Sequence, residues 1–417
     1  MALTRTVIVA GAGIGGLTAS LTLAAQGFRV VVLEKAERLE EAGAGIQLSP
    51  NASRILVELG LKEPLARRAV TPESVNILSA RAGGEIARMP LGQAAEFRAG
   101  APYWVIHRAD LQAALQAAVN DHPDIDLRLG CQFEDVTKHA KGLTVVQRRG
   151  NARQQELAVA LIGADGIHSK VRETLFPGEG GPCWNGLMLW RGATDWPAFL
   201  TGRSMIIAGG LNAKAVIYPI APGSSPASRL TNWAVLVRIG DGSSPPPRRE
   251  GWSNLGRREE MMPYVASFTI PQVDFTGLIN ATPEFWEYPC CDRDPLPYWS
   301  SGRVTLLGDA AHPMYPVGSN GASQAILDAR CLADMLARSE HPRQALAAYE
   351  RQRLPMTADI VASNRRGGPE GVIDAVEQLA PQGFTDVDTI LNYEAREAIV
   401  RGYAAKAGFA ARVVARQ

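Results

Sequence analysis

The first 34 residues alternate between apolar runs and one glycine-rich turn. An apolar run at 7–10 precedes the stretch 11–16, which contains four glycines, and an apolar segment of helix length and a second apolar run at 30–33 follow. This order predicts a strand, a tight turn, a helix and a second strand. Such a βαβ unit is typical of the start of a doubly wound parallel sheet.

A second set of strand-like segments lies farther along the chain, at 74–80, 85–89, 187–193, 204–208, 215–220 and 233–237. The turn residues 82–84 predict a hairpin between the first two segments. Loops rich in Pro, Ser and Gly are predicted at 221–230 and 240–254. The pattern indicates a mostly antiparallel sheet that is inserted between parts of the first domain.

The remaining segments are predicted from the same periodicities. The run at 159–162 and the run before Gly308 are expected to be buried strands, each of which ends in a glycine turn. Segment 91–101 has no periodicity and is predicted to be a surface loop. Helices are expected at 52–59, capped by Ser49 or Asn51, at 109–115 after a strand at 103–108, at 321–337, and over 364–417 with a break at 367–369.

Composition narrows the class of protein. The chain has 417 residues, of which 46% are hydrophobic, and its 43 Lys and Arg against 42 Asp and Glu give a net charge of +1. This length implies two domains or one domain with large insertions, and the balanced charge argues against nucleic acid or a membrane surface as a partner. The five cysteines lack metal-ligand spacing, and no apolar stretch reaches about 18 residues. We therefore expect a cytoplasmic protein without a bound metal, either a monomer or a homodimer.

The glycine turn carries the first candidate chemistry. Gly11 permits the tight turn, Gly13 lets the backbone approach a phosphate, and Gly16 lets the helix pack closely on the strand. The free N–H groups and the positive dipole of the helix N-terminus suit a diphosphate. Glu34 ends the second strand, where its carboxylate can accept hydrogen bonds from both hydroxyls of an adenosine ribose. The segment predicts a dinucleotide site and leaves NAD and FAD open.

Four further positions combine a structural and a functional interpretation. Arg108, at a helix start, either contacts the dinucleotide or is an ordinary surface charge. Asp165, between two glycines, either points into a cleft or caps the following helix. His312 precedes a proline and is expected to be structural rather than a catalytic base. Gly318–Gly321 opens a second helix N-terminus at the edge of the sheet, next to the ligand of the first motif.

Three motifs occur in a fixed order: GAGIGG at 11–16, GADGIHSKVR at 163–172 and GDAAHPMYPVGSNGASQAILDA at 308–329. Together they resemble the FAD-dependent single-component aromatic hydroxylases, the group that includes salicylate and hydroxybenzoate hydroxylases. The third motif, with DRDPLP at 292–297 ahead of it, is especially similar to the methylphenazine carboxylate monooxygenase branch. The resemblance spans about residues 3–365 and does not include 366–417.

The resemblance implies an α/β (α+β) fold. Its parts would be a Rossmann-type FAD-binding domain of the glutathione reductase-like (GR2), p-hydroxybenzoate hydroxylase type, an inserted antiparallel-sheet substrate domain, and C-terminal helices. We expect the FAD-binding domain at 1–73, 102–180 and 285–365, a substrate-domain hairpin at 74–101, the substrate-binding sheet at 181–284, and a helical C-terminal segment at 366–417.

The resemblance also implies which residues bind FAD. Glu34 would hold the adenosine ribose, Arg108 would contact the FAD chain, and Asp309 would bind the ribitol or pyrophosphate. The turn at Asp165 would serve both FAD and the transient reductant, NADH or NADPH. Gly318–Gly321 would lie along the isoalloxazine. The full predicted set is Gly11, Gly13, Ile14, Gly15, Gly16, Glu34, Lys35, Gln47, Arg108, Asp165, Gly166, Asp309, Gly318, Asn320, Gly321 and Ala322.

The implied reaction is the hydroxylation of a small aromatic or heteroaromatic substrate, phenolic or carboxylated. NAD(P)H would reduce FAD, O2 would form a flavin C4a-hydroperoxide, and its terminal oxygen would pass to the ring. Tyr218 would either orient or deprotonate a substrate hydroxyl or only pack, and Arg191 would pair with a substrate carboxylate or form a structural ion pair. Trp190 and the loop 313–316, which ends at Pro316, complete the candidate pocket.

Other functions of this fold stay open. A flavin-dependent oxidoreductase without oxygen insertion and a non-catalytic flavin redox sensor are the alternatives. A flavin halogenase is disfavoured because Trp190 and Trp196 do not form the W-x-W-x-I-P signature. An NAD-dependent dehydrogenase would lack the yellow colour of a bound flavin.

Overall fold

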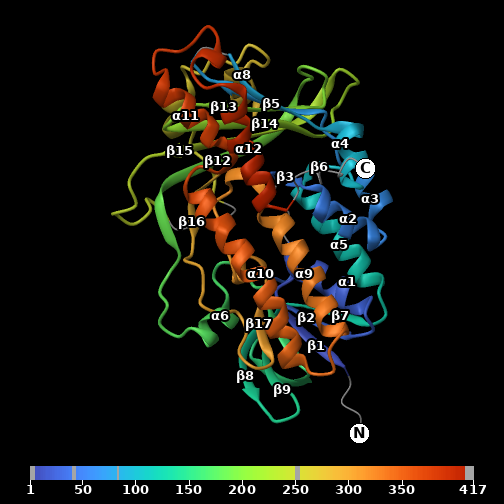
Figure 1. The fold of residues 1–417 in the computed structure, drawn as a ribbon. Helices are drawn as coiled ribbons and strands as arrows, with labels where there is room; N and C mark the ends of the chain where they lie inside the picture. The colour runs from blue at the N-terminus through green and yellow to red at the C-terminus, as the bar shows by residue number, and fades with distance from the viewer. Residues whose placement is uncertain (1–4, 40–43, 82–83, 249–253, 409–417) are drawn as a thin grey trace, which may run out of the picture.

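The structure, a computed structural model, describes residues 5–39, 44–81, 84–248 and 254–408. Two large sheets lie at opposite ends of the molecule, and long helices run along its side between them (Figure 1). Of the predicted segments, turn residues 82–83, loop residues 249–253 and the C-terminal residues 409–417 lie outside the described residues.

The first sheet is parallel throughout. Its strand order is β17 (Val304–Leu306), β11 (Ala160–Gly163), β1 (Thr6–Ala10), β2 (Arg29–Glu34) and β7 (Ile125–Leu129). Every residue of β1 is buried, because elements cover both faces of the sheet. This explains why β1 appears in the sequence as a continuous apolar run rather than an alternating one.

Helices and a small sheet cover this parallel sheet. Helix α1 (Ile14–Ala24) contacts β1 and β2 and packs against α5 (Arg108–Asp121) and α9 (Gly321–Ala337). The small antiparallel sheet comprises β8 (Cys131–Lys138), β9 (Leu143–Arg149) and β10 (Ala152–Ala158), and it contacts β1, β2 and β11. The predicted βαβ unit at the N-terminus is confirmed.

The second sheet has seven strands. Their order is β16 (Trp286–Asp292), β12 (Cys183–Pro197), β15 (Ser228–Arg238), β14 (Ala213–Pro222), β13 (Ser204–Gly209), β4 (Ser74–Ser79) and β5 (Glu85–Pro90). All neighbouring strands are antiparallel except β13 and β4. The predicted strands of this sheet are confirmed. Strand β16 joins it from beyond residue 284, the predicted end of the inserted segment.

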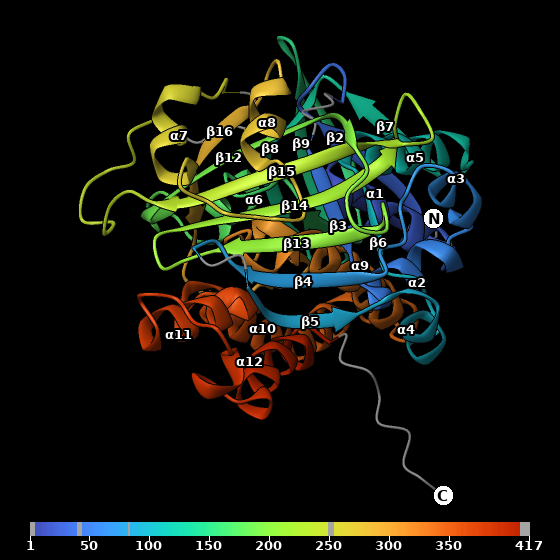
Figure 2. The same cartoon turned by 90° about the horizontal axis from the view of Figure 1, so that it is seen from above.

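Two groups of helices cover the two faces of the second sheet. Helices α7 (Arg258–Val265) and α8 (Phe275–Ala281) cover the outer face, while α11 (Gly371–Leu379) and α12 (Tyr393–Lys406) pack beside β4 and β5 (Figure 2). The long helix α10 (Pro342–Arg365) ends before Gly367 and Gly368, which have φ values of +96° and +54°. These left-handed conformations favour glycine and confirm the predicted helix break.

Short elements connect the two sheets. They are β3 (Gly45–Leu48), which pairs with β6 (Trp104–His107), the helices α2 (Pro50–Glu58), α3 (Lys62–Ala66) and α6 (Lys170–Leu175), and the 3₁₀ turns η1 (Gly308–Ala310), η2 (Val317–Ser319), η3 (Gly368–Glu370) and η4 (Val387–Thr389). Among the described residues, no helix combines the length and the apolar character that a membrane span requires.

Three local predictions were wrong. Segment 91–101 is not a loop, because it contains helix α4 (Gly92–Ala99), which ends at Gly100 with φ +72°. Phe97, the one large apolar residue of α4, is 91% exposed, so the sequence has no periodic set of large apolar residues that would mark this helix. Helix α2 begins earlier than predicted, and the Ser49 hydroxyl donates to Asn51 Oδ1 instead of capping the helix. The loop 221–230 is shorter, because β14 and β15 extend into it.

Candidate active site

The turn between β1 and α1 has no room for side chains at two of its glycines. Gly11 has φ +103°, and a Cβ there would lie 2.4 Å from the Ala164 carbonyl oxygen. A Cβ on Gly16 would lie 2.0 Å from the Gly11 oxygen, whereas one on Gly13 would meet nothing within 4 Å. Gly11 and Gly16 thus serve the turn and the close packing, as predicted, and Gly13 leaves open space above the helix start.

Glu34 is fixed at the carboxyl end of β2. Its Oε2 accepts the Ala12 N–H at 2.8 Å, and its Oε1 accepts the Ala36 N–H at 2.9 Å. These bonds hold an acidic group at the rim of a cavity of about 600 Å³, beside the glycine turn. A carboxylate so placed has further lone pairs for ribose hydroxyls.

Two helix N-termini face this cavity. Helix α1 starts beside Gly13 and α9 starts beside Asn320; neither has a side-chain cap or an acidic residue in its first turn. Residues 13–15 and 319–322 line the cavity. Uncapped N–H groups and the positive end of the helix dipole make both termini favourable places for negative charge.

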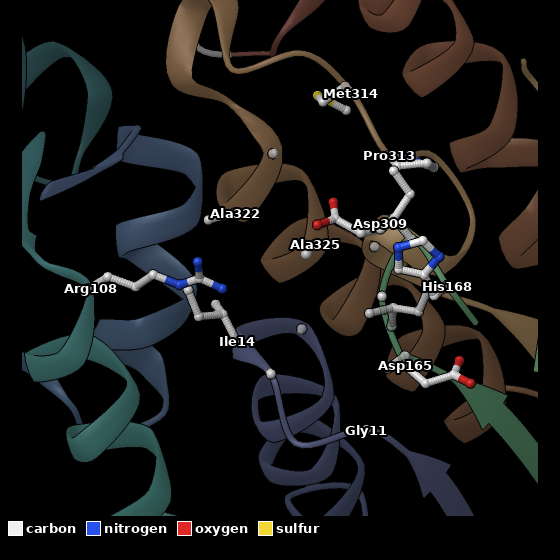
Figure 3. A pocket seen from close by; sticks show the side chains of 18 of the residues that line it. Gly11, Ile14, Arg108, Asp165, His168, Asp309, Pro313, Met314, Ala322 and Ala325 are labelled. Atoms are coloured by element: carbon white, nitrogen blue, oxygen red, sulfur yellow. The ribbon is translucent and has the colours of Figure 1, made fainter. Parts of the chain in front are cut away.

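Arg108 and Asp309 reach into the cavity from opposite sides (Figure 3). Desolvation raises the pKa of Asp309, although His312 and Arg108 oppose this shift, and desolvation lowers the pKa of Arg108, opposed by Asp309. The Asp309 carboxylate accepts no hydrogen bond from the part of the chain that the structure describes. Its oxygens are thus available to the hydroxyls of a bound ligand.

The side chain of Asp165 serves as a local cap. Its carboxylate accepts the N–H groups of Lys170 at 2.7 Å and Val171 at 3.3 Å, and the hydroxyl of Ser169 also donates to it. In Figure 3 the carboxylate points away from the gap between Arg108 and Asp309. Although Asp165 and Gly166 line the cavity, the capping interpretation holds for the Asp165 carboxylate.

His312 belongs to a buried polar cluster behind the cavity. Its Nε2 lies 2.6 Å from Asp328 Oδ2, and Arg353 Nε donates to Asp328 Oδ1 at 2.7 Å. Asp328 Oδ2 also accepts the Gly308 N–H at 3.1 Å, next to Asp309. His312 does not line the cavity, so its structural interpretation is confirmed.

A second chamber of about 450 Å³ adjoins the first cavity on the side of the seven-stranded sheet. Residues from the seven-stranded sheet, from β3 and from the loop before α9 line both spaces: Gly45, Arg191, Tyr218, Tyr288, Pro316 and Ser319. The predicted catalytic residues Arg191, Tyr218 and Pro316 therefore lie together where the two spaces meet. The chamber also takes residues from the C-terminal helices, including Glu370 and Asp374.

Tyr218 and Arg191 are both buried at this junction. Burial raises the pKa of Tyr218, while a hydrogen bond to Gln47 acts in the opposite direction, so the phenol is neutral at physiological pH. Burial likewise lowers the pKa of Arg191, whose guanidinium lies 5.3 Å from the centre of the Tyr288 ring. A buried cation beside a cavity is a strong binding group for a carboxylate.

The prediction that Trp190 lines the substrate pocket was wrong. Successive residues of a strand face opposite sides of a sheet, and Trp190 faces the core formed with α7 and α8, whereas Arg191 faces the chamber. The indole N–H of Trp190 donates to Glu287 Oε2 at 2.9 Å, so its polar group is satisfied in that core.

The structure brings 14 of the 16 predicted cofactor residues to the first cavity, all except Gly16 and Gly318. Gly16 lies beneath the turn, and the Gly318 N–H donates to Glu370 Oε1 at 3.1 Å, so that Gly318 faces the C-terminal helices. Sequence analysis missed the cavity residues Gln132, Phe133, His168, Tyr288, Cys290 and Cys291. Among the described residues, no group of three or more His, Cys, Asp and Glu is placed to hold a metal.

Comparison with known proteins defines the family. Residues 4–254 and 295–364 match the family described as FAD binding domain, to which the chain therefore belongs. The chain is 41% identical over 368 residues to phenazine 1,6-dicarboxylic acid hydroxylase PhzS of Lysobacter antibioticus, covering 86% of this chain and 89% of that protein. It is 34% identical over 393 residues to 3-hydroxybenzoate 6-hydroxylase of Klebsiella oxytoca, covering 92% and 94%.

A solved structure supports the fold. HpxO of Klebsiella pneumoniae, complexed with FAD and uric acid, superposes with a TM-score of 0.76 at 22% identity, covering 97% of this chain and 96% of that one. The family match and the two relatives confirm the predicted membership of the FAD-dependent aromatic hydroxylases. The protein is a flavoprotein monooxygenase with FAD as its cofactor.

Proposed function

We propose that this protein hydroxylates a planar heteroaromatic carboxylate that is held between the flavin cavity and the seven-stranded sheet, with NADH or NADPH as reductant. The observation that carries this proposal is the shared wall of the two spaces. A buried cation, Arg191, and a neutral phenol, Tyr218, both belong to it. An aromatic acid in the chamber would therefore meet the cofactor with its carboxylate oriented.

The first cavity fits FAD by its own chemistry. Glu34 would hold the adenosine ribose, the two helix N-termini would offset the negative charges of the pyrophosphate and the reduced ring, and Asp309 would accept from ribitol hydroxyls. When bound, FAD supplies the electrons and the activated oxygen for hydroxylation. The chain itself must orient the substrate and exclude water.

Substrate orientation would come from three residues. Arg191 would bind the carboxylate through two parallel hydrogen bonds. Tyr218, neutral and hydrogen-bonded to Gln47, would orient a polar group on the ring. Pro316, on the loop before α9, would limit how the ring approaches the cofactor. This placement of the substrate agrees with the predicted division of the chain. The FAD-binding domain would form one wall, the substrate domain the other, and the C-terminal segment would be a third part.

The relatives guide the choice of substrate. The name of PhzS gives a phenazine dicarboxylic acid as its substrate, and that of the Klebsiella oxytoca relative gives 3-hydroxybenzoate. A chamber of about 450 Å³ lies within the range of about 300–1,000 Å³ that is typical of drug-sized ligands. This volume admits both kinds of acid, and the higher identity to PhzS ranks fused-ring carboxylates above benzoates. The cytoplasmic location and the monomer or homodimer stay predictions.

The test measures NADH and NADPH oxidation by the purified yellow protein with phenazine-1-carboxylate, phenazine-1,6-dicarboxylate and 3-hydroxybenzoate. Under ¹⁸O2, the product of an accepted substrate should gain one labelled oxygen atom. Stimulated oxidation of the reductant without labelled product would favour the oxidoreductase alternative. Flavin reduction without turnover on any of these acids would favour the redox sensor.

A further inference from the structure

Glu370 is a buried acid in the substrate chamber that the proposed function does not use. The residue is 6% exposed, follows the helix break in η3, and lines the chamber together with Tyr218 and Pro316. Its Oε1 accepts the Gly318 N–H at 3.1 Å. Its Oε2 is buried and accepts no hydrogen bond from any residue that the structure describes. A buried carboxylate oxygen without a hydrogen-bond partner is costly while it carries charge, so the site favours a proton on this carboxylate.

Charged and titratable groups face Glu370 from several elements. Lys214 of β14 is the neighbouring cation, although it is paired with Asp374 of α11 at 2.7 Å. The phenols of Tyr103 and Tyr403 face it from the segment before β6 and from α12. The other charged residues that line the chamber are Arg191, Arg238, Arg365 and Arg366.

Resting on the proposed function, we propose that Glu370 is the proton acceptor of the chamber for aromatic acids that bear an ionisable ring O–H or N–H, as 3-hydroxybenzoate does among the acids tested above. The substrate O–H or N–H bond breaks, and its proton forms a new O–H bond on the Glu370 carboxylate. The electron pair stays on the substrate heteroatom and enriches the ring that is to be hydroxylated. Glu370 would then return the proton to water after product release.

The environment of Glu370 suits this role. Burial raises its pKa, while the Gly318 N–H and Lys214 oppose the shift, so the carboxylate is more basic than an exposed one. A raised pKa of the Glu370 carboxyl group is closer to the pKa of a phenol, which makes proton transfer from the substrate more favourable. The neighbouring phenols cannot replace it, because burial raises the pKa values of Tyr103 and Tyr218 and keeps both protonated.

The test uses the holoenzyme and 3,5-difluoro-4-hydroxybenzoate as probe. The ¹⁹F chemical shift reports whether the bound probe is a phenol or a phenolate, and calorimetry in two buffers counts the protons released on binding. Glu370→Gln removes the proton acceptor but keeps an oxygen for the Gly318 N–H. Glu377→Gln is the matched control, because Glu377 is equally buried in α11, pairs with Arg81 at 2.8 Å and does not line the chamber.

At a pH where the free probe is protonated, the wild type and Glu377→Gln should bind it as phenolate without net proton release. Glu370→Gln should bind it as phenol, or as phenolate with one proton released per probe. For hydroxylated substrates kcat should fall about 100-fold or more, and the acid limb of kcat/KM against pH should disappear. Visible absorbance and thermal unfolding check that FAD content and fold are retained.

A wild-type ¹⁹F shift and proton count in Glu370→Gln, or a bound phenol in the wild type, would overturn the assignment. These outcomes are distinct from a failure of the proposed function. If the proposed function failed, even the wild type would incorporate no ¹⁸O into any of the tested acids.

Discussion

Asp328→Asn tests the buried cluster that supports the flavin cavity. The Asp328 carboxylate is fully buried and holds Arg353, which is 4% exposed, together with His312 and the Gly308 N–H. An asparagine keeps the shape and an acceptor oxygen, but it leaves the Arg353 charge buried without its counter-ion. Breaking a buried ion pair in this way costs about 3–5 kcal/mol. Because Gly308 precedes Asp309, we also expect weaker FAD retention.

The assay is urea unfolding of the wild type and the variant at neutral pH, with the visible absorbance as a measure of bound FAD. Asp334→Asn is the control, because Asp334 lies on the same helix but is 28% exposed and pairs with the half-exposed Arg330. It should cost about 0–1 kcal/mol. If Asp328→Asn costs no more than this control, the cluster does not stabilise the fold as argued.

The stability difference between the wild type and Asp328→Asn should also depend on pH. Burial alone raises the pKa of Asp328, but attraction by His312 and Arg353 outweighs it, so the pKa in the folded protein is lowered. A lowered pKa contributes stability above the unfolded value of about 3.9, and this contribution disappears as the pH falls through the folded pKa. The stability difference between wild type and Asp328→Asn should therefore be constant near neutral pH and shrink below about pH 4.

Variants at three further positions test the assigned site. Asp309→Ala should lose most of its FAD on gel filtration, and a normal flavin content would remove Asp309 from the cofactor site. Arg191→Gln should raise KM for carboxylate substrates about 10- to 100-fold, from the loss of about 1.5–3 kcal/mol of charge-assisted hydrogen bonding; Arg191→Lys should recover only part of it. Gly45→Ala would place a Cβ 2.8 Å from the Tyr218 hydroxyl oxygen and should waste reductant without product, whereas Gly402→Ala, where a Cβ meets nothing within 4 Å, should leave the coupling unchanged.

The cofactor half of the site was predictable because its signals are local in sequence. The glycine turn, Glu34 at the strand end and the Gly308-Asp309 turn each occupy a few consecutive residues, and a parallel sheet buried on both faces gives continuous apolar runs. The choice between the two interpretations of Asp165 depended on where its carboxylate points, which no sequence window contains.

The substrate half was harder to predict because its residues come from segments without periodicity. Tyr288 lies on β16, an edge strand interrupted by Pro289, which is tolerated there because one side of an edge strand has no ladder to complete. Glu370 follows a helix break, and its burial depends on contacts with distant elements. Trp190 and Arg191 are adjacent in sequence but face opposite sides of the sheet, so only the register could separate the core residue from the pocket residue.

The C-terminal segment links the two halves of the site. A Cβ on Gly318, whose φ is +69°, would lie 2.3 Å from the Tyr403 hydroxyl oxygen, and the Gly318 N–H is held by Glu370. The loop before α9 therefore has α12 packed on one side and an acid of the substrate chamber bonded to it. Its next residues, Ser319 and Asn320, line the flavin cavity. Because one short loop forms walls of both spaces, a change in the protonation of Glu370 acts on a hydrogen bond at Gly318, one residue from the wall of the flavin cavity.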